Sequence, residues 1–199
     1  MHFEKDYIYH VYNRSNQTVF PEQENYTFFL GKIEKHIMPY GDILAWCLMP
    51  NHFHFMIQVN AGGIQNINEK HRKDTQQLSK SWGIVLSSYT RAVNKRFTRR
   101  GFLWSHNTKA PEINLKGNDY GINCFKYIHQ NPVNAGLVSR MEDWPYSSYV
   151  EFLNYFRGKP DQKYIANIEL ANEIFNLNKH NFESISKGGI NEEAISQIF

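Results

Sequence analysis

The sequence predicts an α+β fold of the ferredoxin-like kind, in which an antiparallel sheet has one face covered by helices and the other free for a site. Short segments with alternating apolar residues indicate strands, and longer segments with apolar residues every three or four positions indicate helices. In chain order these segments read strand, helix, strand, strand, helix, strand. That order is the split βαβ arrangement, to which the chain adds a further helix and a helical C-terminal extension.

The first half of the pattern is a strand, a helix and a hairpin. Residues 7–12 alternate as a strand does, and a helix is expected to open near residue 20 and to stop near residue 39. Residues 43–59 read as two strands joined at Pro50-Asn51. Proline suits the second position of a tight turn and asparagine the third, so the turn is expected there.

The second half is less regular. Residues 61–74 are polar and are predicted to form a loop. A long basic helix is predicted over about 75–98, because its apolar residues are spaced by three or four. Residues 102–113 have room for one or two short strands, and another helix is expected from about 119 to 131.

The length of 199 residues suits one domain with an appendage. We predict a domain over residues 1–150 and a C-terminal extension over residues 151–199. The composition of Gly158-Lys159-Pro160 is typical of a boundary segment. Helical spacing returns between residues 164 and 177. The sequence assigns no role to the extension.

Composition indicates a soluble intracellular protein. Hydrophobic residues make up 41% of the chain, which suffices for a core. No apolar stretch approaches the ~20 residues of a membrane span, and no signal peptide is visible. Cys47 and Cys124 are expected to be buried thiols rather than a disulfide. The net charge of +3 and the pI near 8.7 permit nucleic-acid binding without proving it.

His52-Phe53-His54 is the first candidate for chemistry, because a strand places alternate side chains on opposite faces. Phe53 is expected to face the core and the two imidazoles the other side. Residues two apart on a strand lie roughly 6.5–7 Å apart, so both imidazoles can converge on one metal ion. The same spacing equally suits two partly exposed histidines that bind nothing, so the pattern needs support from a second segment.

That second segment is the helix of residues 119–131. Tyr127 and Asn131 lie four apart on one face of it, so the helix presents a phenol and, one turn later, an amide oxygen to the same space. Pro132 disfavours helical geometry at the residue before it, which places Asn131 in the last turn or just past it. A single tyrosine in a helix is more often a packing residue, and this chain has 12 tyrosines.

Taken together, these segments resemble the single-tyrosine HUH transposases, and among them the REP-associated tyrosine transposases, small bacterial relatives of insertion-sequence enzymes. The resemblance covers about residues 7–150 in the family's order, and residues 151–199 carry no part of it. The matching segments are His10-Val11-Tyr12-Asn13-Arg14, Met49-Pro50-Asn51-His52-Phe53-His54, Gly101-Phe102-Leu103-Trp104, Lys126-Tyr127-Ile128-His129-Gln130-Asn131-Pro132-Val133 and Tyr146-Ser147-Ser148-Tyr149.

The resemblance implies a DNA transposase that cleaves and rejoins single-stranded DNA near hairpins through a covalent 5′-phosphotyrosine intermediate. It implies Tyr127 as the nucleophile and His52 and His54 as metal ligands. Asn131 stands four residues past the nucleophile, where the family has its third ligand. Two imidazoles, an amide oxygen and phosphate oxygens suit Mg²⁺ or Mn²⁺. His129 lies about 200° round the helix from Tyr127, so it is expected to be structural or to face DNA.

A basic cluster closes the long helix and has two interpretations. Cations near a helix C-terminus complement the helix dipole and need no ligand. Beside a nuclease site the same cluster becomes a phosphate track. The predicted DNA-binding residues are Arg14, Lys95, Arg96, Arg99, Arg100 and Lys126.

The resemblance implies single-stranded DNA with hairpin or palindromic elements as the partner, and the bacterial cytoplasm as the location, at the nucleoid when DNA is bound. The sequence does not decide whether the chain is a monomer or a homodimer. Most of the 12 Tyr, 14 Phe and 4 Trp residues are expected in the core. Tyr12, Trp104 and Tyr146 are candidates for stacking on unpaired bases.

Two rival functions remain. One is a noncatalytic single-stranded nucleic-acid-binding module on a ferredoxin-like fold, although the chain lacks the glycine-aromatic strand signature of RNA-recognition modules. The other is a metal-dependent hydrolase in which water attacks in place of Tyr127. Such enzymes usually need more ligands, and the next aspartate after His54 is Asp74.

Overall fold

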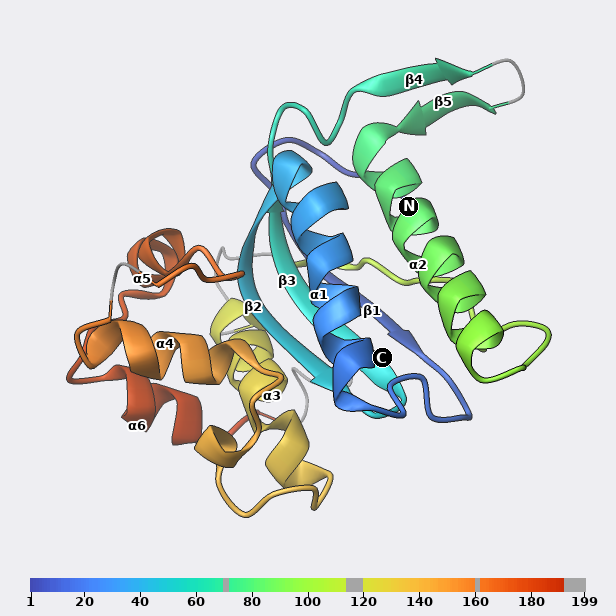
Figure 1. The fold of residues 1–199 in the computed structure, drawn as a ribbon. Helices are drawn as coiled ribbons and strands as arrows, with labels where there is room; N and C mark the ends of the chain where they lie inside the picture. The colour runs from blue at the N-terminus through green and yellow to red at the C-terminus, as the bar shows by residue number, and fades with distance from the viewer. Residues whose placement is uncertain (70–71, 114–119, 160–161, 192–199) are drawn as a thin grey trace.

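A four-stranded antiparallel sheet lies at the centre of the chain (Figure 1). The computed structural model describes residues 1–69, 72–113, 120–159 and 162–191. The strands are β1 (Ile8–Arg14), β2 (Gly41–Met49), β3 (His52–Val59) and β6 (Glu112–Ile113), in the order β2-β3-β1-β6. Because β3 runs antiparallel between β1 and β2, the predicted α+β, ferredoxin-like class is confirmed.

The turn between β2 and β3 falls at Pro50-Asn51, as predicted. The Pro50 carbonyl accepts hydrogen bonds from the backbone N–H groups of Val19 (2.8 Å) and Phe20 (3.1 Å). The Asn51 carbonyl accepts one from the Ser15 N–H at 2.8 Å. The hairpin tip is therefore anchored to the segment that follows β1, which fixes where β3 begins.

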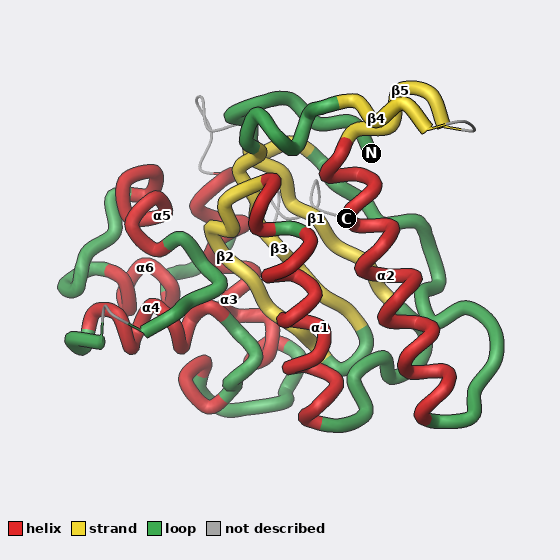
Figure 2. Tube along the Cα trace, turned by 45° about the horizontal axis from the view of Figure 1, so that its top comes forward, coloured by secondary structure: helices red, strands yellow, loops and turns green. Residues whose placement is uncertain are grey.

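Helices α1 (Gln23–His36) and α2 (Gln77–Arg96) cover one face of the sheet (Figures 1 and 2). Phe53 of β3 stacks on Trp82 of α2 with ring centroids 5.4 Å apart, and lies 5.5 Å from Phe29 of α1. All three side chains are fully buried. The short 3₁₀ helix η1 (Met38–Tyr40) links α1 to β2. The predicted alternation along β3 is therefore confirmed on the face of the sheet that α1 and α2 cover.

Helix α3 (Tyr120–Asn134) packs against the sheet from the other side, mainly on β2. Its last residue, Asn134, lies three residues beyond the predicted end near residue 131, so Pro132 is inside the helix. The helix ends in a glycine motif: Gly136 has φ 68° and donates to the Val133 carbonyl, while the Leu137 N–H donates to the Pro132 carbonyl. Asn131 therefore lies within the last turn of a properly closed helix.

The loop predicted for residues 61–74 is wrong in part. A two-stranded hairpin, β4 (Asn66–Glu69) and β5 (Arg72–Gln76), occupies most of it and projects beyond the sheet (Figure 1). Residues 70–71 lie outside the described residues. Apolar alternation marks a strand only where one face is buried, so a strand pair of polar residues carries no such signal.

Three helices follow α3 and share its core. They are α4 (Ser148–Phe156), α5 (Ile168–Phe175) and α6 (Phe182–Lys187), preceded by the 3₁₀ helix η2 (Met141–Asp143). Phe152 lies 5.4 Å from Phe125 of α3 and 5.0 Å from Phe182 of α6, measured between ring centroids. Helices α4, α5 and α6 thus bury their apolar faces against α3, on the side of α3 that faces away from α1 and α2 (Figure 2).

Polar contacts also tie this extension to β2. The Glu151 carboxylate accepts hydrogen bonds from the Trp46 indole N–H (3.0 Å) and from the backbone of Ile165 and Ala166, both at 2.9 Å. Helix α4 runs across the predicted division between residues 150 and 151. The division itself stays a prediction, and residues 192–199 lie outside the described part of the chain.

Both cysteines are buried free thiols, as predicted. Burial raises the pKa of each thiol above its usual range, so both are unreactive at neutral pH. Of the described helices, none has the length and apolar character needed to cross a bilayer.

Phe182→Ala should lower the free energy of unfolding of the whole chain by about 3–5 kcal/mol, because it opens a cavity among the buried rings of α3, α4 and α6. Urea unfolding followed by circular dichroism measures this. Phe28→Ala, at a position 45% exposed, is the control and should cost about 1 kcal/mol or less. A separate, early transition that alone responds to Phe182→Ala would contradict the shared core.

Candidate active site

The register of β1 on β3 brings polar side chains together on the face opposite α1 and α2. Tyr12 pairs with His54, and Arg14 pairs with His52. A cavity of about 260 Å³ opens over them. It is lined from three segments of the chain by Tyr12, Asn13, Arg14, His52, His54, Tyr127, Asn131, Asn134 and Ala135. The structure therefore brings together the nucleophile and all three ligands that the sequence predicts.

The hydrogen bonds around His52 determine which of its nitrogens carries the proton. The Asn51 side-chain nitrogen donates to the Ser15 carbonyl at 3.3 Å, which turns the Asn51 oxygen toward His52. An amide oxygen only accepts, so His52 Nδ1 donates to it, at 2.7 Å. The lone pair on His52 Nε2 is then directed at Asn131 Oδ1, 3.2 Å away. Two acceptor atoms face each other across the cavity.

His54 is held by a second imidazole, that of His10 on β1. His54 Nδ1 and His10 Nε2 are 2.9 Å apart, and the two rings stack at 5.1 Å. Both residues are buried, with 2% and 0% of their surface exposed. His54 Nε2 has no hydrogen-bond partner in the described structure. When His54 Nδ1 donates to His10, this buried Nε2 carries a lone pair.

Tyr127 and Asn131 reach the same cavity from α3. The Tyr127 ring meets His54 edge-on at 5.4 Å between centroids and His10 at 6.5 Å. The side chain of Asn131, one turn further along the helix, acts on the Tyr127 hydroxyl and lowers its pKa. The i, i+4 spacing in the sequence thus places phenol and amide side by side.

Burial keeps the imidazoles of the site neutral. It lowers the pKa of His10 to about 3 and that of His54 well below its usual range, where His10, His52 and Arg14 add repulsion. The pKa of His52 is also lowered, first by burial and less by Arg14, although Asn131 Oδ1 would accept a hydrogen bond from the protonated ring and so acts in the opposite direction. Neutral imidazole is the form that binds metal ions.

Burial also raises the pKa of Tyr127, to about 12. The side chain of Asn131 and the charge of Arg14 act in the opposite direction and lower this pKa. The phenol is therefore protonated at neutral pH, and two neighbours favour its phenolate form.

The predicted DNA-binding residues lie in three places. Arg14 is exposed at the lip of the cavity. Lys95, Arg96, Arg99 and Arg100 lie at and beyond the end of α2, where Arg96 pairs with Glu22 and Arg99 hydrogen-bonds Gln17. Lys126 reaches the Gly189 carbonyl at 3.3 Å and does not line the cavity.

The three aromatic candidates for base stacking have different surroundings. Tyr12 lines the cavity. Tyr146 stacks on Tyr26, with ring centroids 3.7 Å apart. Trp104 packs edge-on against Phe53 at 5.3 Å and is half-buried.

His129, by contrast, is structural. It is fully buried, and its Nε2 hydrogen-bonds Ser148 Oγ at 2.8 Å. Ser148 in turn bonds both the N–H and the carbonyl of Trp46, so this contact joins α3, α4 and β2.

His10 is the site residue that sequence reasoning missed. Its signal was present: His10, Tyr12 and Arg14 are alternate residues of the first strand and so share a face. Which face that is depends on the pairing of β1 with β3, and the sequence does not state that pairing. Among the described residues, no three His, Cys, Asp or Glu side chains form a metal-binding cluster. A metal ion at this site would therefore take ligands of other kinds as well.

Comparison with known proteins gives one relative in sequence and one in structure. No family model matches the chain. A curated protein of Escherichia coli (strain K12), the REP-associated tyrosine transposase, is 24% identical over 108 residues, which is 54% of each chain. The match thus spans about half the length of that relative. A solved structure of a REP-associated tyrosine transposase bound to a REP hairpin superposes with a TM-score of 0.58 at 17% identity, covering 77% of this chain and 82% of the other.

This chain is therefore similar in sequence to a REP-associated tyrosine transposase and shares the fold of one.

The segments that resemble the REP-associated tyrosine transposases lie together in space. The motif at Tyr146-Ser147-Ser148-Tyr149 runs along β2, where the Leu48 N–H donates to the Tyr146 carbonyl at 2.9 Å. Ser148 of that motif holds His129 of the tyrosine helix. The motifs thus mark the site and the contacts that hold α3 over it.

The free energy of unfolding should fall as the pH drops from 7 to 5, in part through His129. Burial lowers the pKa of His129 to about 3, whereas an unfolded histidine titrates near 6.5. Between these values the unfolded chain binds the extra proton, so the stability is present above about pH 6.5 and is lost on acidification. The loss at pH 5 is roughly 2 kcal/mol for this residue.

Urea unfolding at a series of pH values measures the effect. His129→Gln should flatten the dependence by about that amount, whereas His180→Gln, at an exposed position, should leave it as in the wild type. Identical slopes for His129→Gln and wild type would show that the buried imidazole does not resist protonation.

Proposed function

We propose that this chain cleaves and rejoins single-stranded DNA beside hairpins, with Tyr127 as the nucleophile. The observation that carries the proposal is the meeting of Tyr127 and Asn131 with His52 and His54 in one cavity, from segments more than seventy residues apart. The relative's name as a transposase and the hairpin bound in the neighbouring structure support DNA as the substrate.

The donor atoms of the cavity fit a divalent cation, Mg²⁺ or Mn²⁺. His52 Nε2 and Asn131 Oδ1 are two acceptors 3.2 Å apart with no hydrogen to share, and His54 Nε2 is buried without a partner in the described structure. Such atoms are stabilised by a positive charge between them. A bound cation would polarise the scissile phosphate and stabilise the departing oxygen.

Tyr127 supplies the bond-forming oxygen. Its hydroxyl loses a proton as the oxygen attacks phosphorus, and the 3′-oxygen of the upstream nucleotide leaves and becomes a free hydroxyl. The product is a 5′-phosphotyrosine. One phosphodiester replaces another, so a 3′-hydroxyl can attack the link and rejoin the strand without ATP. The side chain of Asn131 and the charge of Arg14 favour the phenolate that forms.

His10 and Asn51 orient the two histidines for this role. Each accepts a hydrogen bond from the Nδ1–H of its histidine, which leaves both Nε2 atoms directed into the cavity. Arg14 at the lip would contact the phosphate backbone, and Lys95, Arg96, Arg99, Arg100 and Lys126 would extend the contact. All residues of the cavity come from one chain. The homodimer stays a prediction.

Tyr127→Phe should abolish covalent attachment to DNA. Incubation with a labelled hairpin oligonucleotide and Mg²⁺ or Mn²⁺, followed by denaturing electrophoresis, should show a protein–DNA adduct in the wild type. The adduct should fall by about 10³-fold or more in Tyr127→Phe, because no other group supplies the attacking oxygen. Tyr120→Phe, on the same helix, is the matched control.

Each rival function predicts a different result in electrophoresis. Water attack predicts strand cleavage without an adduct, unchanged in Tyr127→Phe. A binding module predicts a mobility shift with neither cleavage nor adduct. Either result would contradict the proposal.

Asn131→Ala should raise the metal concentration needed for half-maximal cleavage by roughly 10-fold or more, because it removes one ligand atom. Asn134→Ala removes the same side chain one turn later on the same cavity wall and should leave the metal titration unchanged. His52→Ala and His54→Ala should abolish cleavage while retaining hairpin binding. An unchanged titration in Asn131→Ala would remove Asn131 from the ligand set.

A further inference from the structure

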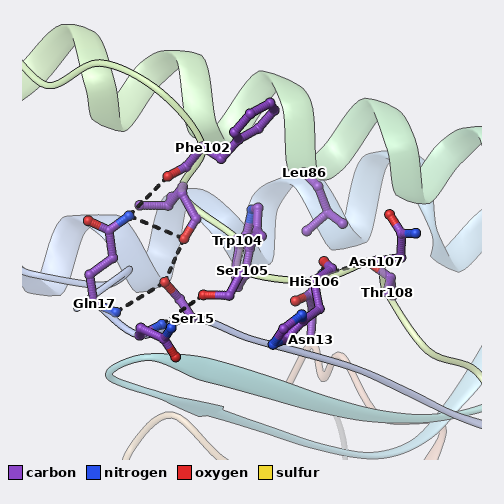
Figure 3. Close-up of a pocket in the computed structure, with 12 residues that line it drawn as sticks. Asn13, Ser15, Gln17, Leu86, Phe102, Trp104, Ser105, His106, Asn107 and Thr108 are labelled. Atoms are coloured by element: carbon purple, nitrogen blue, oxygen red, sulfur yellow. Dashed lines mark hydrogen bonds between the residues drawn. The ribbon is translucent and has the colours of Figure 1, made fainter.

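A second and larger hollow lies beside the end of β1, on the sheet face that carries α2 (Figure 3). Its walls come from Asn13 and residues 15–17, from the loop of residues 102–108 and from Leu86 of α2. Its volume is about 900 Å³, which falls in the range of roughly 300–1,000 Å³ found for ligand sites. We call it the 102–108 groove.

The lining of this groove combines apolar side chains, Trp104 among them, with polar groups that carry no fixed charge. Asn16, Gln17, Asn107 and Thr108 contribute amides and a hydroxyl, His106 contributes an imidazole, and none of the described residues that line it is Lys, Arg, Asp or Glu. Amide and hydroxyl groups both donate and accept hydrogen bonds. The edges of nucleobases present the same mixture of neutral donors and acceptors, whereas a phosphate would call for cations.

Phe102 stands at the mouth of the groove and is 94% exposed, the most exposed of the large apolar side chains described (Figure 3). The backbone beneath it is held in place. Gln17 Nε2 donates to the Phe102 carbonyl at 3.0 Å, and Ser15 Oγ donates to the Leu103 carbonyl at 2.6 Å. Gly101, at φ 88°, turns the chain just before it, a conformation that residues with a Cβ rarely adopt. A fixed loop thus presents a bare aromatic ring to solvent.

The groove and the proposed active site are neighbours across the end of β1. Asn13 lines both hollows, which lie on the two faces of the end of β1. The loop is bound to this strand by hydrogen bonds from the Ser105 N–H to the Arg14 carbonyl and from the Lys109 N–H to the Tyr12 carbonyl, at 3.2 and 3.0 Å. A nucleic-acid strand with one phosphate in the cavity would reach the groove by passing round the end of this one strand.

We propose that the 102–108 groove binds unpaired bases next to the phosphate attacked by Tyr127, with the Phe102 ring stacked on a base and the amides of the walls bonding base edges. For its ligand the proposal rests on the DNA substrate of the proposed function. Arg99 hydrogen-bonds Gln17 of the groove wall and Arg14 lines the cavity, so the two cations are placed for phosphates on either side of the bound bases.

Binding of three DNA hairpins tests the groove. The first carries an unpaired extension of randomised sequence on each side, the second the same extensions built of abasic nucleotides, and the third no extension. Fluorescence anisotropy with EDTA present measures affinity without cleavage. The wild type should bind the first hairpin most tightly, because abasic extensions keep the phosphates and lack the stacking surface.

Phe102→Ala should weaken binding of the first hairpin by about 5- to 100-fold and leave the other two unchanged, since a stacked base contributes an effect of that size. Phe102→Trp should restore the affinity. Tyr7→Ala is the matched control: Tyr7 is 45% exposed and precedes the far end of β1, about 20 Å along the strand from Asn13.

Equal affinity of the wild type for the hairpins with base-bearing and abasic extensions would contradict the proposal that the 102–108 groove binds bases. An unchanged affinity in Phe102→Ala would contradict it as well. Either result could accompany normal adduct formation by Tyr127, in which case the proposed function would stand. A base-dependent affinity that Phe102→Ala removes, in a protein that forms no adduct, would support the groove and refute the chemistry.

Discussion

The pairing of β1 with β3 is the constraint on which the site depends. Strand β3 is central and covered on both faces, so its side chains alternate between two different environments. Phe53 enters the apolar layer under α1 and α2, and His54 enters the opposite layer under α3. A buried imidazole needs a hydrogen-bond partner, and the register supplies His10 from β1. A slip of one residue would exchange these faces and remove the site.

Burial has opposite consequences for the two kinds of group in the cavity. It keeps His10, His52 and His54 neutral, which suits them to hold and orient a cation. It also keeps the Tyr127 phenol protonated, which makes it a weak nucleophile until positive charge is near. Under the proposed function, the cavity is stable without charge and would become reactive when cation and phosphate are present. Helix α3 places Tyr127 and Asn131 in that position, and the C-terminal helices bury the other side of α3.

In our proposals the two hollows on either side of β1 bind different parts of a DNA strand. The cavity has the atoms proposed to hold a cation and Arg14 at its lip, as a phosphate requires. The 102–108 groove has neutral amides and the exposed Phe102, as a base requires. Asn13 lines both hollows, so only strand β1 separates the two proposed binding regions.

By itself the sequence determined what local spacing encodes: the period of two at His52-Phe53-His54, the turn at Pro50-Asn51, and the one-turn spacing of Tyr127 and Asn131. These depend on neighbours in the chain, so they are legible before folding. Only the tertiary structure decided that His10 supports His54, that the polar residues 66–76 pair as a hairpin and that the loop after α2 forms a groove. Each of these joins residues without an apolar pattern across long stretches of chain. Their partners are chosen by strand register and packing, which no single segment specifies.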